Sequence, residues 1–249
     1  MIDSAPLPGL WPGFDFSAII SNMKQFDIVT IFPDILDSYF NESLFKRAQK
    51  NKLIKIKTHF LRKWTSDRHQ TVDEKPYGGG VGLLFKVEPI YKCLRSLKVL
   101  DKTERKKKKT RVILTAANGK RFTQRDAERL AKYDRLVFVC PRYEGIDARV
   151  EKMIDEKISI GDYVLAGGEL PAAVIIESVC RQIPGFVGKQ ESVAGDSHKE
   201  AGYLEFPQYT RPEVFETKEG QKWRVPKVLL SGHHAEIEKW RGLKSNKQN

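Results

Sequence analysis

The sequence predicts an α/β fold built on a parallel sheet. Apolar, β-branched runs typical of buried strands alternate with stretches of helical periodicity along most of the chain. Such alternation is characteristic of parallel sheets whose connections are helices. Several of the predicted strands are followed by loops rich in glycine or proline. Because ligands of parallel sheets bind beyond the carboxyl ends of the strands, these loops are the expected binding region.

Local signals place the elements in chain order. Residues 26–32 form an apolar first strand, and 34–49, after Pro33, show helical spacing. Thr123 can cap a helix that runs to about Lys132, because its hydroxyl can accept a hydrogen bond from the first turn. The other strands are expected at 53–60, 111–115, 135–140 and 157–160, and the other helices at 88–97, 146–153, 168–181 and 235–243.

Charge and cysteine usage narrow the class of protein. The 44 Lys and Arg exceed the 32 Asp and Glu, and the net charge of +12 favours a polyanionic partner, because neutralised phosphates release counterions. The basic run 105–109 is expected to be a solvated loop. Three cysteines without a CxxC pair indicate reduced thiols in a cytoplasm rather than a zinc site or disulfides. No apolar run reaches the ~18 residues of a membrane span, and because the first residues lack a basic stretch followed by an apolar one, no signal peptide is expected.

Four regions are expected along the chain. Residues 1–24, with three prolines, are expected to be a flexible leader, and 25–185 carry the sheet. The stretch 184–200 has three glycines and little apolar periodicity, which predicts a mobile linker over 186–200. Residues 201–249 should form a small, mainly helical unit that can hold little core of its own.

The segment SIGDYVLAGGELPA at 159–172 is the most constrained part of the sequence. It places Gly161, Gly167, Gly168 and Pro171 between a predicted strand and a predicted helix. Glycine is needed where a ligand or another backbone approaches within the radius of a Cβ, or where φ is positive. The segment therefore predicts a turn that encloses a ligand, with an unliganded strand–turn–helix connection as the structural alternative. Dinucleotide-binding, P-loop, zinc-protease and nucleophile-elbow motifs are absent from the sequence.

Further motifs occur in one order along the chain. They read DEKPYGGGVG at 73–82, CPRYEGIDARV at 140–150, SIGDYVLAGGELPA at 159–172, GDS at 195–197, YTRPEVF at 209–215 and VLLSGHHAEIEKWR at 228–241. Together with FDIVTIFPDIL near the start, they closely resemble the bacterial tRNA (guanine-N1)-methyltransferases, which act on the guanosine 3′ to the anticodon. The resemblance extends from about Phe26 to Arg241.

The resemblance implies a fold and partners that the pattern alone does not. It implies a SPOUT-type parallel sheet whose C-terminal part forms a deep trefoil knot, with a helical C-terminal tRNA-binding domain. It also implies S-adenosylmethionine as the cofactor, a homodimer with shared active sites, and tRNA through its anticodon stem-loop, with neither DNA nor membrane as partner. Mg²⁺ is implied as an aid, although no carboxylate cluster in the sequence predicts a metal site.

By motif, the resemblance assigns the cofactor to three loops. The first has TAANG where the family usually has SPxG, which places Ala117 at the missing proline. In the second, Pro141 stands where many relatives have glycine, so a contact from that amide is lost. The cofactor residues assigned in this way are Leu114, Thr115, Ala117, Gly119, Pro141, Glu144, Gly145, Ser159, Ile160, Gly161, Tyr163, Leu165, Gly167, Gly168 and Pro171.

The resemblance also assigns catalytic and RNA-contacting residues. Asp196 matches the general base that removes the N1 proton of guanine, and Arg181 matches the group that stabilises charge on O6. Without the resemblance, Asp196 is an exposed linker residue and Arg181 a helix-end ion-pair partner. The candidate RNA contacts are Arg142, Tyr77, Gly79 and Arg211.

Two other functions compete with this interpretation. A catalytically silent RNA-binding protein could keep the fold, but the presence of both Arg181 and Asp196 argues against it. A SPOUT methyltransferase with another RNA target is the second alternative. The YTRPEVF and GHHAEIEKWR segments, which lie outside the cofactor region, argue against that one.

Overall fold

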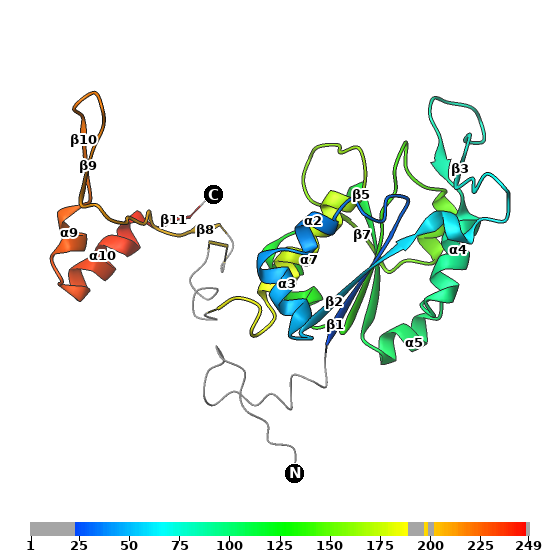
Figure 1. Cartoon of the computed structure of the whole chain (residues 1–249), viewed down its shortest axis with the longest axis horizontal. Helices are drawn as coiled ribbons and strands as arrows, with labels where there is room; N and C mark the ends of the chain where they lie inside the picture. The colour runs from blue at the N-terminus through cyan, green and yellow to red at the C-terminus, as the bar shows by residue number, and fades with distance from the viewer. Residues whose placement is uncertain (1–22, 189–196, 199–201, 248–249) are drawn as a thin grey trace, which may run out of the picture. The chain divides into compact units, whose positions relative to one another are not determined.

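A computed structural model describes residues 23–188, 197–198 and 202–247 of the chain (Figure 1). The chain divides into two compact units, Met1–Gly188 and Lys189–Asn249, and each is described by itself. In the described part of the chain, no helix is long and apolar enough to cross a membrane. Cys93, Cys140 and Cys180 are buried free thiols, as the sequence predicted.

The first unit is built on a five-stranded sheet with the order β2-β1-β6-β5-β7, and every neighbouring pair is parallel. This confirms the α/β prediction. The strands are β1 Lys24–Thr30, β2 Ile54–Phe60, β5 Thr110–Arg121, β6 Arg135–Val139 and β7 Glu156–Ser159. The helices are α2 Asp37–Phe40, α3 Ser43–Lys50, α4 Val87–Ser96, α5 Lys102–Lys107, α6 Gln124–Leu130 and α7 Glu169–Arg181. Two 3₁₀ turns, η1 Leu61–Trp64 and η2 Ala148–Lys152, and the antiparallel pair β3 Asp73–Glu74 and β4 Leu84–Phe85 complete the unit.

Alternation along the strands builds a core on each face of the sheet. Leu136 and Phe138 of β6 pack into a cluster with side chains of α3, α6 and α7. Val137 and Val139, which point the other way because side chains alternate, pack into a second cluster with side chains of α4 and η2. Helices on both faces bury both sides of the sheet, which is what a parallel sheet requires.

A buried carboxylate joins three strands at the second face. Asp27 of β1 is fully buried and accepts hydrogen bonds from Arg135 Nε at 2.6 Å and Gln25 Nε2 at 2.8 Å. His59 Nε2 of β2 lies 2.6 Å from the other carboxylate oxygen. Burial raises the pKa of Asp27, but the hydrogen bonds with His59 and Arg135 outweigh it, so the pKa is lowered. The charged Asp27 side chain therefore links β1 to its two neighbours, β2 and β6, a contact that we call the charged tie.

Several predicted elements differ from the structure. The helix expected at 34–49 is interrupted between α2 and α3 at Asn41 and Glu42, and 148–152 form a 3₁₀ turn rather than an α-helix. The basic run 105–109, expected as a solvated loop, lies largely in α5, which Asp101 caps by accepting from the Thr103 amide at 2.7 Å. By contrast, Thr123 is the N-cap of α6 as expected, with Asp126 in the first turn, and the helix ends at Leu130 rather than at about Lys132.

Burial explains why the basic run is not a loop. Arg105 is 2% exposed, and its Nη1 donates to the Met153 carbonyl at 2.7 Å. Its Nη2 lies 3.0 Å from Asp155 Oδ1. One arginine of the run thus tethers α5 to the segment before β7, while the neighbouring lysines remain in solvent.

The expected region boundaries also shift by a few residues. Lys24, expected in the leader, begins β1 and is buried, with Nζ donating to the Ala131 carbonyl at 2.7 Å. Phe186, expected in the linker, is 1% exposed and packs edge-on against Phe45. Both residues therefore belong to the sheet-containing unit, and the rest of the leader, 1–22, lies outside the described residues.

The second unit is less helical than expected. It contains α9 Lys227–Leu230 and α10 His234–Lys244, but also a hairpin of β9 Val214–Glu216 with β10 Lys222–Arg224, and a short pair of β8 Tyr203–Leu204 with β11 Asn246–Lys247. Gly220, at φ +82°, allows the tight turn of the hairpin. Phe215 and Trp223 pack across the strands with ring centroids 5.7 Å apart.

Candidate active site

The three stretches expected to be constrained, one within β5 and the loops after β6 and β7, line one cavity of about 410 Å³. This volume falls in the range of roughly 300–1,000 Å³ that small-molecule sites occupy. Of the fifteen residues expected to hold a cofactor, all but Gly119 and Gly161 line it: Leu114, Thr115, Ala117, Pro141, Glu144, Gly145, Ser159, Ile160, Tyr163, Leu165, Gly167, Gly168 and Pro171. The spatial meeting of the three loops is therefore as the sequence predicted.

Two glycines let the walls of the cavity approach each other. A Cβ on Gly168 would lie 2.1 Å from Thr115 Oγ1 and 2.8 Å from Cys140 Cα, so α7 could not begin so close to β5 and β6 with any larger residue. A Cβ on Gly119 would lie 2.6 Å from the Ile158 amide nitrogen. Gly119 thus brings β5 against β7 rather than lining the cavity. The loop predicted around Gly119 is not a separate connection. It is an irregular part of β5, where the pairing with β7 shifts register between Thr115 and Lys120.

The third loop leaves backbone groups available to a ligand. Ser159 Oγ donates to the Gly161 carbonyl at 2.9 Å and accepts from its amide at 3.3 Å, which closes the start of the loop. Among the described residues, the amides of Tyr163 and Leu165 donate no hydrogen bond, although both residues line the cavity. Free amides beside an apolar wall suit a flat, acceptor-rich heterocycle.

The second loop is held by an ion pair beneath the cavity. Glu169, 1% exposed at the start of α7, accepts from Arg142 Nε at 2.9 Å and from Thr30 Oγ1 at 2.6 Å. The Arg142 guanidinium also lies 4.8 Å from the centre of the Phe32 ring. The ion pair ties the loop after β6 to the ends of β1 and α7. Arg142 lines the cavity while it is fixed in this way.

The same loop is anchored to the strand before α4. The Glu144 amide donates to the Leu83 carbonyl at 3.1 Å, and the Phe85 amide donates to the Gly145 carbonyl at 3.0 Å. Tyr143 at φ +57° and Gly145 at φ +120° allow the sharp turn between these anchors. The turn presents Glu144 at the cavity wall.

Cys140 is not a nucleophile of this site. Burial raises the pKa of its thiol well above the usual value, and the nearby Glu169 carboxylate raises it further. Since the thiolate is the reactive form of cysteine, this side chain is unreactive at neutral pH. Cys140 acts as part of the apolar wall behind Gly168.

Of the other expected site residues, Arg142 lines this cavity, whereas Arg181 does not. Arg181 is the last residue of α7, about 20 Å along the helix from Gly168. Tyr77 is fully exposed, in the same glycine-rich turn as Gly79. Arg211 is exposed in the second unit. Asp196 lies outside the described residues.

Sequence reasoning missed several residues of the cavity wall. The wall also includes Ala116, Asn118, Tyr143, Ile146, Ala148, Glu151, Lys157, Ile158, Val164 and Ala166. Glu151 and Lys157 pair at 2.9 Å, and they come from η2 and β7, which were interpreted only as regular elements. Neither glycine content nor a motif marks them. In the described ranges, no group of three His, Cys, Asp or Glu side chains could hold a metal ion.

Comparison with known proteins identifies the family. The family model described as "tRNA (Guanine-1)-methyltransferase TrmD" matches residues 23–249. The chain belongs to the tRNA (guanine-1)-methyltransferase family. Its cavity and glycine-rich third loop are therefore features of a methyltransferase, and the resemblance drawn from the motifs is confirmed.

Curated relatives match over most of their length. A tRNA (guanine-N(1)-)-methyltransferase of Dictyoglomus turgidum is 48% identical over 219 residues, covering 88% of this chain and 84% of the relative. Enzymes of the same name from Dehalococcoides mccartyi and Clostridium acetobutylicum are 45% and 46% identical over 222 and 217 residues. The alignments cover 89% and 87% of this chain, and 85% and 84% of those relatives.

Proposed function

We propose that this protein transfers a methyl group from S-adenosylmethionine to N1 of the guanosine 3′ to the anticodon of tRNA, position 37. Family membership and the names of the relatives support methyl transfer to a guanine of tRNA as the reaction class. The observation that carries the proposal to this chain is the cavity formed by the three loops. The substrate would place the reaction in the cytoplasm, where tRNA is modified.

The residues of the cavity fit the proposed cofactor. The free amides of Tyr163 and Leu165 can donate to the ring nitrogens of an adenine, while Ile160 and Pro171 contribute apolar surface. Pro141 has no amide hydrogen to donate, so the third loop carries most of the recognition. When bound, the sulfonium of S-adenosylmethionine supplies the methyl group.

Asp196 and Arg181 are proposed to activate the guanine. Neutral guanine keeps a proton on N1, and the nitrogen becomes a good nucleophile when a carboxylate within hydrogen-bond reach removes it. The Asp196 carboxylate would take that proton, and the Arg181 guanidinium would stabilise the negative charge that develops on O6. The proposal rests on the motif match of both residues. Assistance by Mg²⁺ stays a prediction from the resemblance.

A homodimer with shared sites is proposed because the resemblance implies one, and the position of Arg181 supports it. Arg181 lies at the far end of α7 from the cavity, so a second copy is the simplest source of this group. Exposed apolar side chains surround the start of α7, including Leu170 at 61% and Val174 at 45% exposure. Ile35, near the end of β1, adds another at 47%. Large exposed apolar side chains of this kind are candidates for a surface between two copies of the chain.

The remaining parts of the resemblance complete the proposal. The chain around the three loops would thread as a deep trefoil knot, and the residues after Gly188 would link it to a tRNA-binding C-terminal domain that begins at about residue 201. Arg142, Tyr77, Gly79 and Arg211 are the proposed RNA contacts. Exposure of Tyr77 and Arg211 is compatible with this role.

Labelled S-adenosylmethionine and an unmodified tRNA transcript test the reaction. The expected product is N1-methylguanosine at the position next to the anticodon, identified by mass spectrometry of the digested RNA. Asp196→Asn should abolish transfer while the dissociation constant for the cofactor stays unchanged. Glu128→Gln, which makes the same carboxylate-to-amide change at an exposed residue of α6, is the matched control and should keep full activity.

The two levels of the proposal fail separately. Tight cofactor binding with no methyl transfer to any tRNA would overturn the assigned reaction. Full activity of the Asp196→Asn variant would overturn only the role of the general base. Mixing Asp196→Asn with an Arg181→Ala variant tests the shared site, because heterodimers then restore one complete site. No recovery of activity on mixing would contradict that arrangement.

A further inference from the structure

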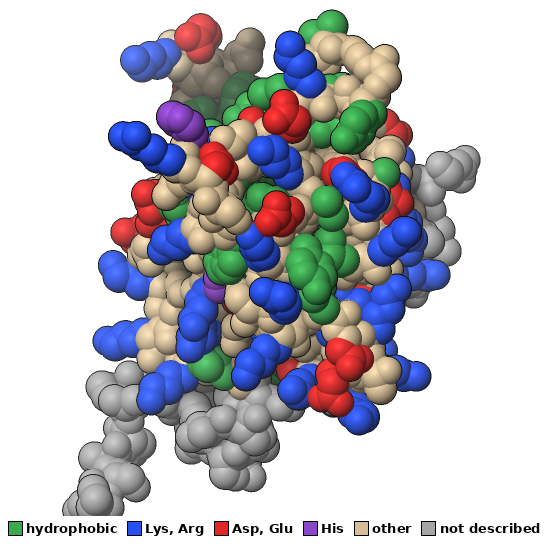
Figure 2. Space-filling view, turned by 90° about the vertical axis from the view of Figure 1, so that its right-hand side faces the viewer, with side chains coloured by type: hydrophobic (Ala, Val, Ile, Leu, Met, Phe, Trp, Pro, Cys, Tyr) green, Lys and Arg blue, Asp and Glu red, His purple; other side chains and the backbone are tan. Residues whose placement is uncertain are grey.

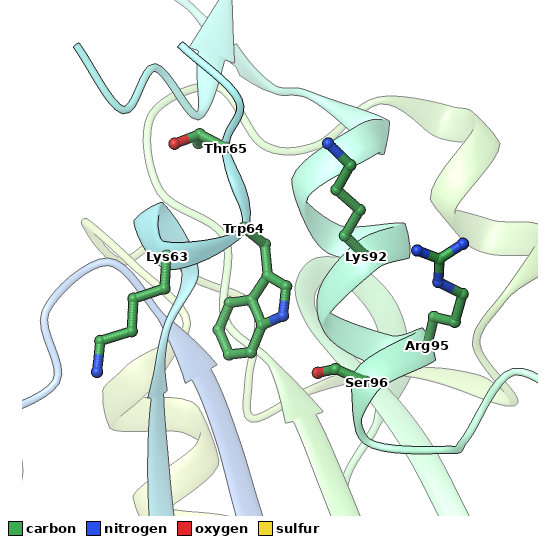
Figure 3. Close-up of a pocket in the computed structure, with 6 residues that line it drawn as sticks. All are labelled: Lys63, Trp64, Thr65, Lys92, Arg95 and Ser96. Atoms are coloured by element: carbon green, nitrogen blue, oxygen red, sulfur yellow. The ribbon is translucent and has the colours of Figure 1, made fainter. Parts of the chain in front are cut away.

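A second cavity of the first unit lies away from the proposed active site. It is about 420 Å³ in volume and lies between η1 and the C-terminal half of α4 (Figure 3). Its lining residues are Lys63, Trp64, Thr65, Lys92, Arg95 and Ser96. We call this the η1–α4 cleft. None of these residues lines the other cavity, so the cleft is a distinct feature.

The hydrogen-bond donors left in the cleft are the cationic side chains and the indole N–H of Trp64. Thr65 Oγ1 donates to the Arg62 carbonyl at 2.8 Å, and Ser96 Oγ donates to the Cys93 carbonyl at 2.7 Å. Both hydroxyl hydrogens are therefore used within the protein. No carboxylate lines the cleft. A ligand would meet ammonium and guanidinium donors without a competing anion in the wall.

Two of the three cations have no carboxylate partner. Within the described part of the chain, Lys63 and Arg95 form no ion pair, and Arg95 instead lies 5.7 Å from the centre of the Tyr91 ring. Lys92 is paired with Glu88 at 2.7 Å and donates to Ser66 Oγ at 2.6 Å. The pair is partly exposed, so water screens it and leaves a weak interaction.

The arginines of the sheet behave differently. Arg111 and Arg129 pair with Glu156 at 2.8 and 2.7 Å, and Arg135 pairs with Asp27 at 2.6 Å. Structural arginines of this unit thus neutralise buried or half-buried carboxylates. Since Lys63 and Arg95 neutralise no carboxylate among the described residues, their positive charges are available to an anionic partner.

Trp64 gives the cleft a flat apolar surface beside these cations. The indole is partly buried against the core cluster of the second face and lies 6.3 Å from the His59 ring, centre to centre. In Figure 3 it lies between the side chain of Lys63 and helix α4, with Ser96 and Lys92 opposite. An aromatic face bordered by cations suits a sugar or base next to a phosphate.

We propose that the η1–α4 cleft binds the sugar–phosphate backbone of the substrate RNA. This inference rests on the proposed function for the identity of the polyanion. Lys63 and Arg95 contact phosphate oxygens, and Trp64 packs against the adjoining sugar or base. Phosphate contacts fix the position of an RNA without reading its sequence, so the cleft acts in binding and not in the choice of base.

The surroundings of the cleft agree with an extended polyanion. Figure 2 shows the face that carries α4 and α5, where Lys and Arg side chains outnumber acidic ones and are spread over the whole surface. Lys98, Lys102 and Lys106 are exposed on this side of the chain, after or within these helices. A single small anion would need only the cleft, whereas an RNA strand can use the cations around it.

The place of the cleft in the sheet puts it within reach of one RNA molecule. η1 follows directly from the carboxyl end of β2, and residues 114–118 of β5 line the proposed active site. β2 and β5 are three strand spacings apart in the order β2-β1-β6-β5, or roughly 14 Å. A stem-loop whose target base enters the active site can therefore lay its backbone along the cleft.

Salt-dependent binding of an unmodified tRNA transcript tests the cleft. In the full-length Lys63→Gln/Arg95→Gln variant, the slope of log affinity against log salt should fall by about 2, because each lost phosphate contact removes about 1. KM for tRNA should rise at least fivefold with kcat unchanged. The matched control is Lys46→Gln/Lys50→Gln, which removes two exposed cations from α3 on the other face of the sheet.

Each outcome decides the question. A drop in slope confined to the cleft variant supports the proposal. Equal drops in both variants mean that only net charge matters, and an unchanged slope in the cleft variant means that the cleft does not contact RNA; either result overturns it. Binding is measured independently of catalysis. Absence of methyl transfer by the wild-type protein would therefore overturn the proposed function without deciding the role of the cleft.

Discussion

Replacing Gly168 by alanine tests the physical basis of the proposed active site. The added Cβ would lie 2.1 Å from Thr115 Oγ1 and 2.8 Å from Cys140 Cα. Thr115 is 1% exposed and donates to the Val139 carbonyl at 3.3 Å, so its side chain has little room to move. Cys140 Cα is backbone and cannot rotate away. The start of α7 must therefore shift from β5 and β6.

The expected cost follows from this overlap. Overpacking a dense core by one methyl group costs about 1–3 kcal/mol, and an obstacle in the backbone places Gly168→Ala near the upper end. For a protein of this size, each kcal/mol lowers the melting temperature by roughly 2–4 °C, so a fall of about 4–12 °C is expected. Since Gly168 also lines the cavity, the affinity for S-adenosylmethionine should fall at the same time.

Thermal and urea unfolding, followed by far-UV circular dichroism without ligand, measure the stability, and calorimetric titration measures cofactor binding. Gly188→Ala is the matched control, because its Cβ would meet nothing within 4 Å. Its stability should stay within about 0.5 kcal/mol of the wild type. If Gly168→Ala were as stable as Gly188→Ala and bound the cofactor normally, the close approach of α7 to the strands would not be needed, and the argument would be wrong.

Two further predictions concern buried ionisable groups. Asp27→Asn should destabilise the protein by roughly 3–5 kcal/mol at pH 7, because Arg135 loses its buried partner. The pKa of Asp27 is lowered in the folded state, so its stabilisation is full above the unfolded pKa of about 3.9 and is lost as pH falls through the folded value. Urea titrations between pH 7 and pH 3 should show a weaker acid dependence in the variant, and an identical dependence would contradict the charged tie. Burial, with a smaller contribution from Asp27, raises the pKa of Cys93 to about 12, so at pH 8 a disulfide reagent should label it on the order of a thousandfold more slowly than in denaturant. Rapid labelling of Cys93 in the folded protein, located by peptide mapping, would rule this out.

The success of the sequence predictions varies with the range of the interactions. Four strands of the sheet were predicted within a few residues because their apolar patterns are local and strong, whereas β5 continues to Arg121, beyond the end predicted at Thr115. The prediction of one helix at 34–49 was wrong in its centre, where Asn41 and Glu42 separate α2 from α3. The prediction of a loop for the basic run was wrong because the partners of Arg105, Met153 and Asp155, lie about fifty residues further along the chain.

The cavity shows the same division. The sequence pointed to its glycines because glycine is recognisable as a residue type. It left open whether each glycine is needed for close approach or for a positive φ. Gly168 and Gly119 are needed for close approach and not for a positive φ. The wall residues Glu151 and Lys157 leave no such mark, since their side chains line the cavity only because η2 and β7 are brought together.

The sequence by itself determined the α/β class, the family and the three loops that meet at the site, because periodicity, glycine and ordered motifs are properties of the chain. Only the tertiary structure decided which groups share a surface. It showed that Arg142 is held by Glu169, and that Arg181 lies far from the cavity in its own chain. It also brought Lys63 and Arg95 to one cleft. Contacts between residues distant in sequence depend on packing, which no local pattern records.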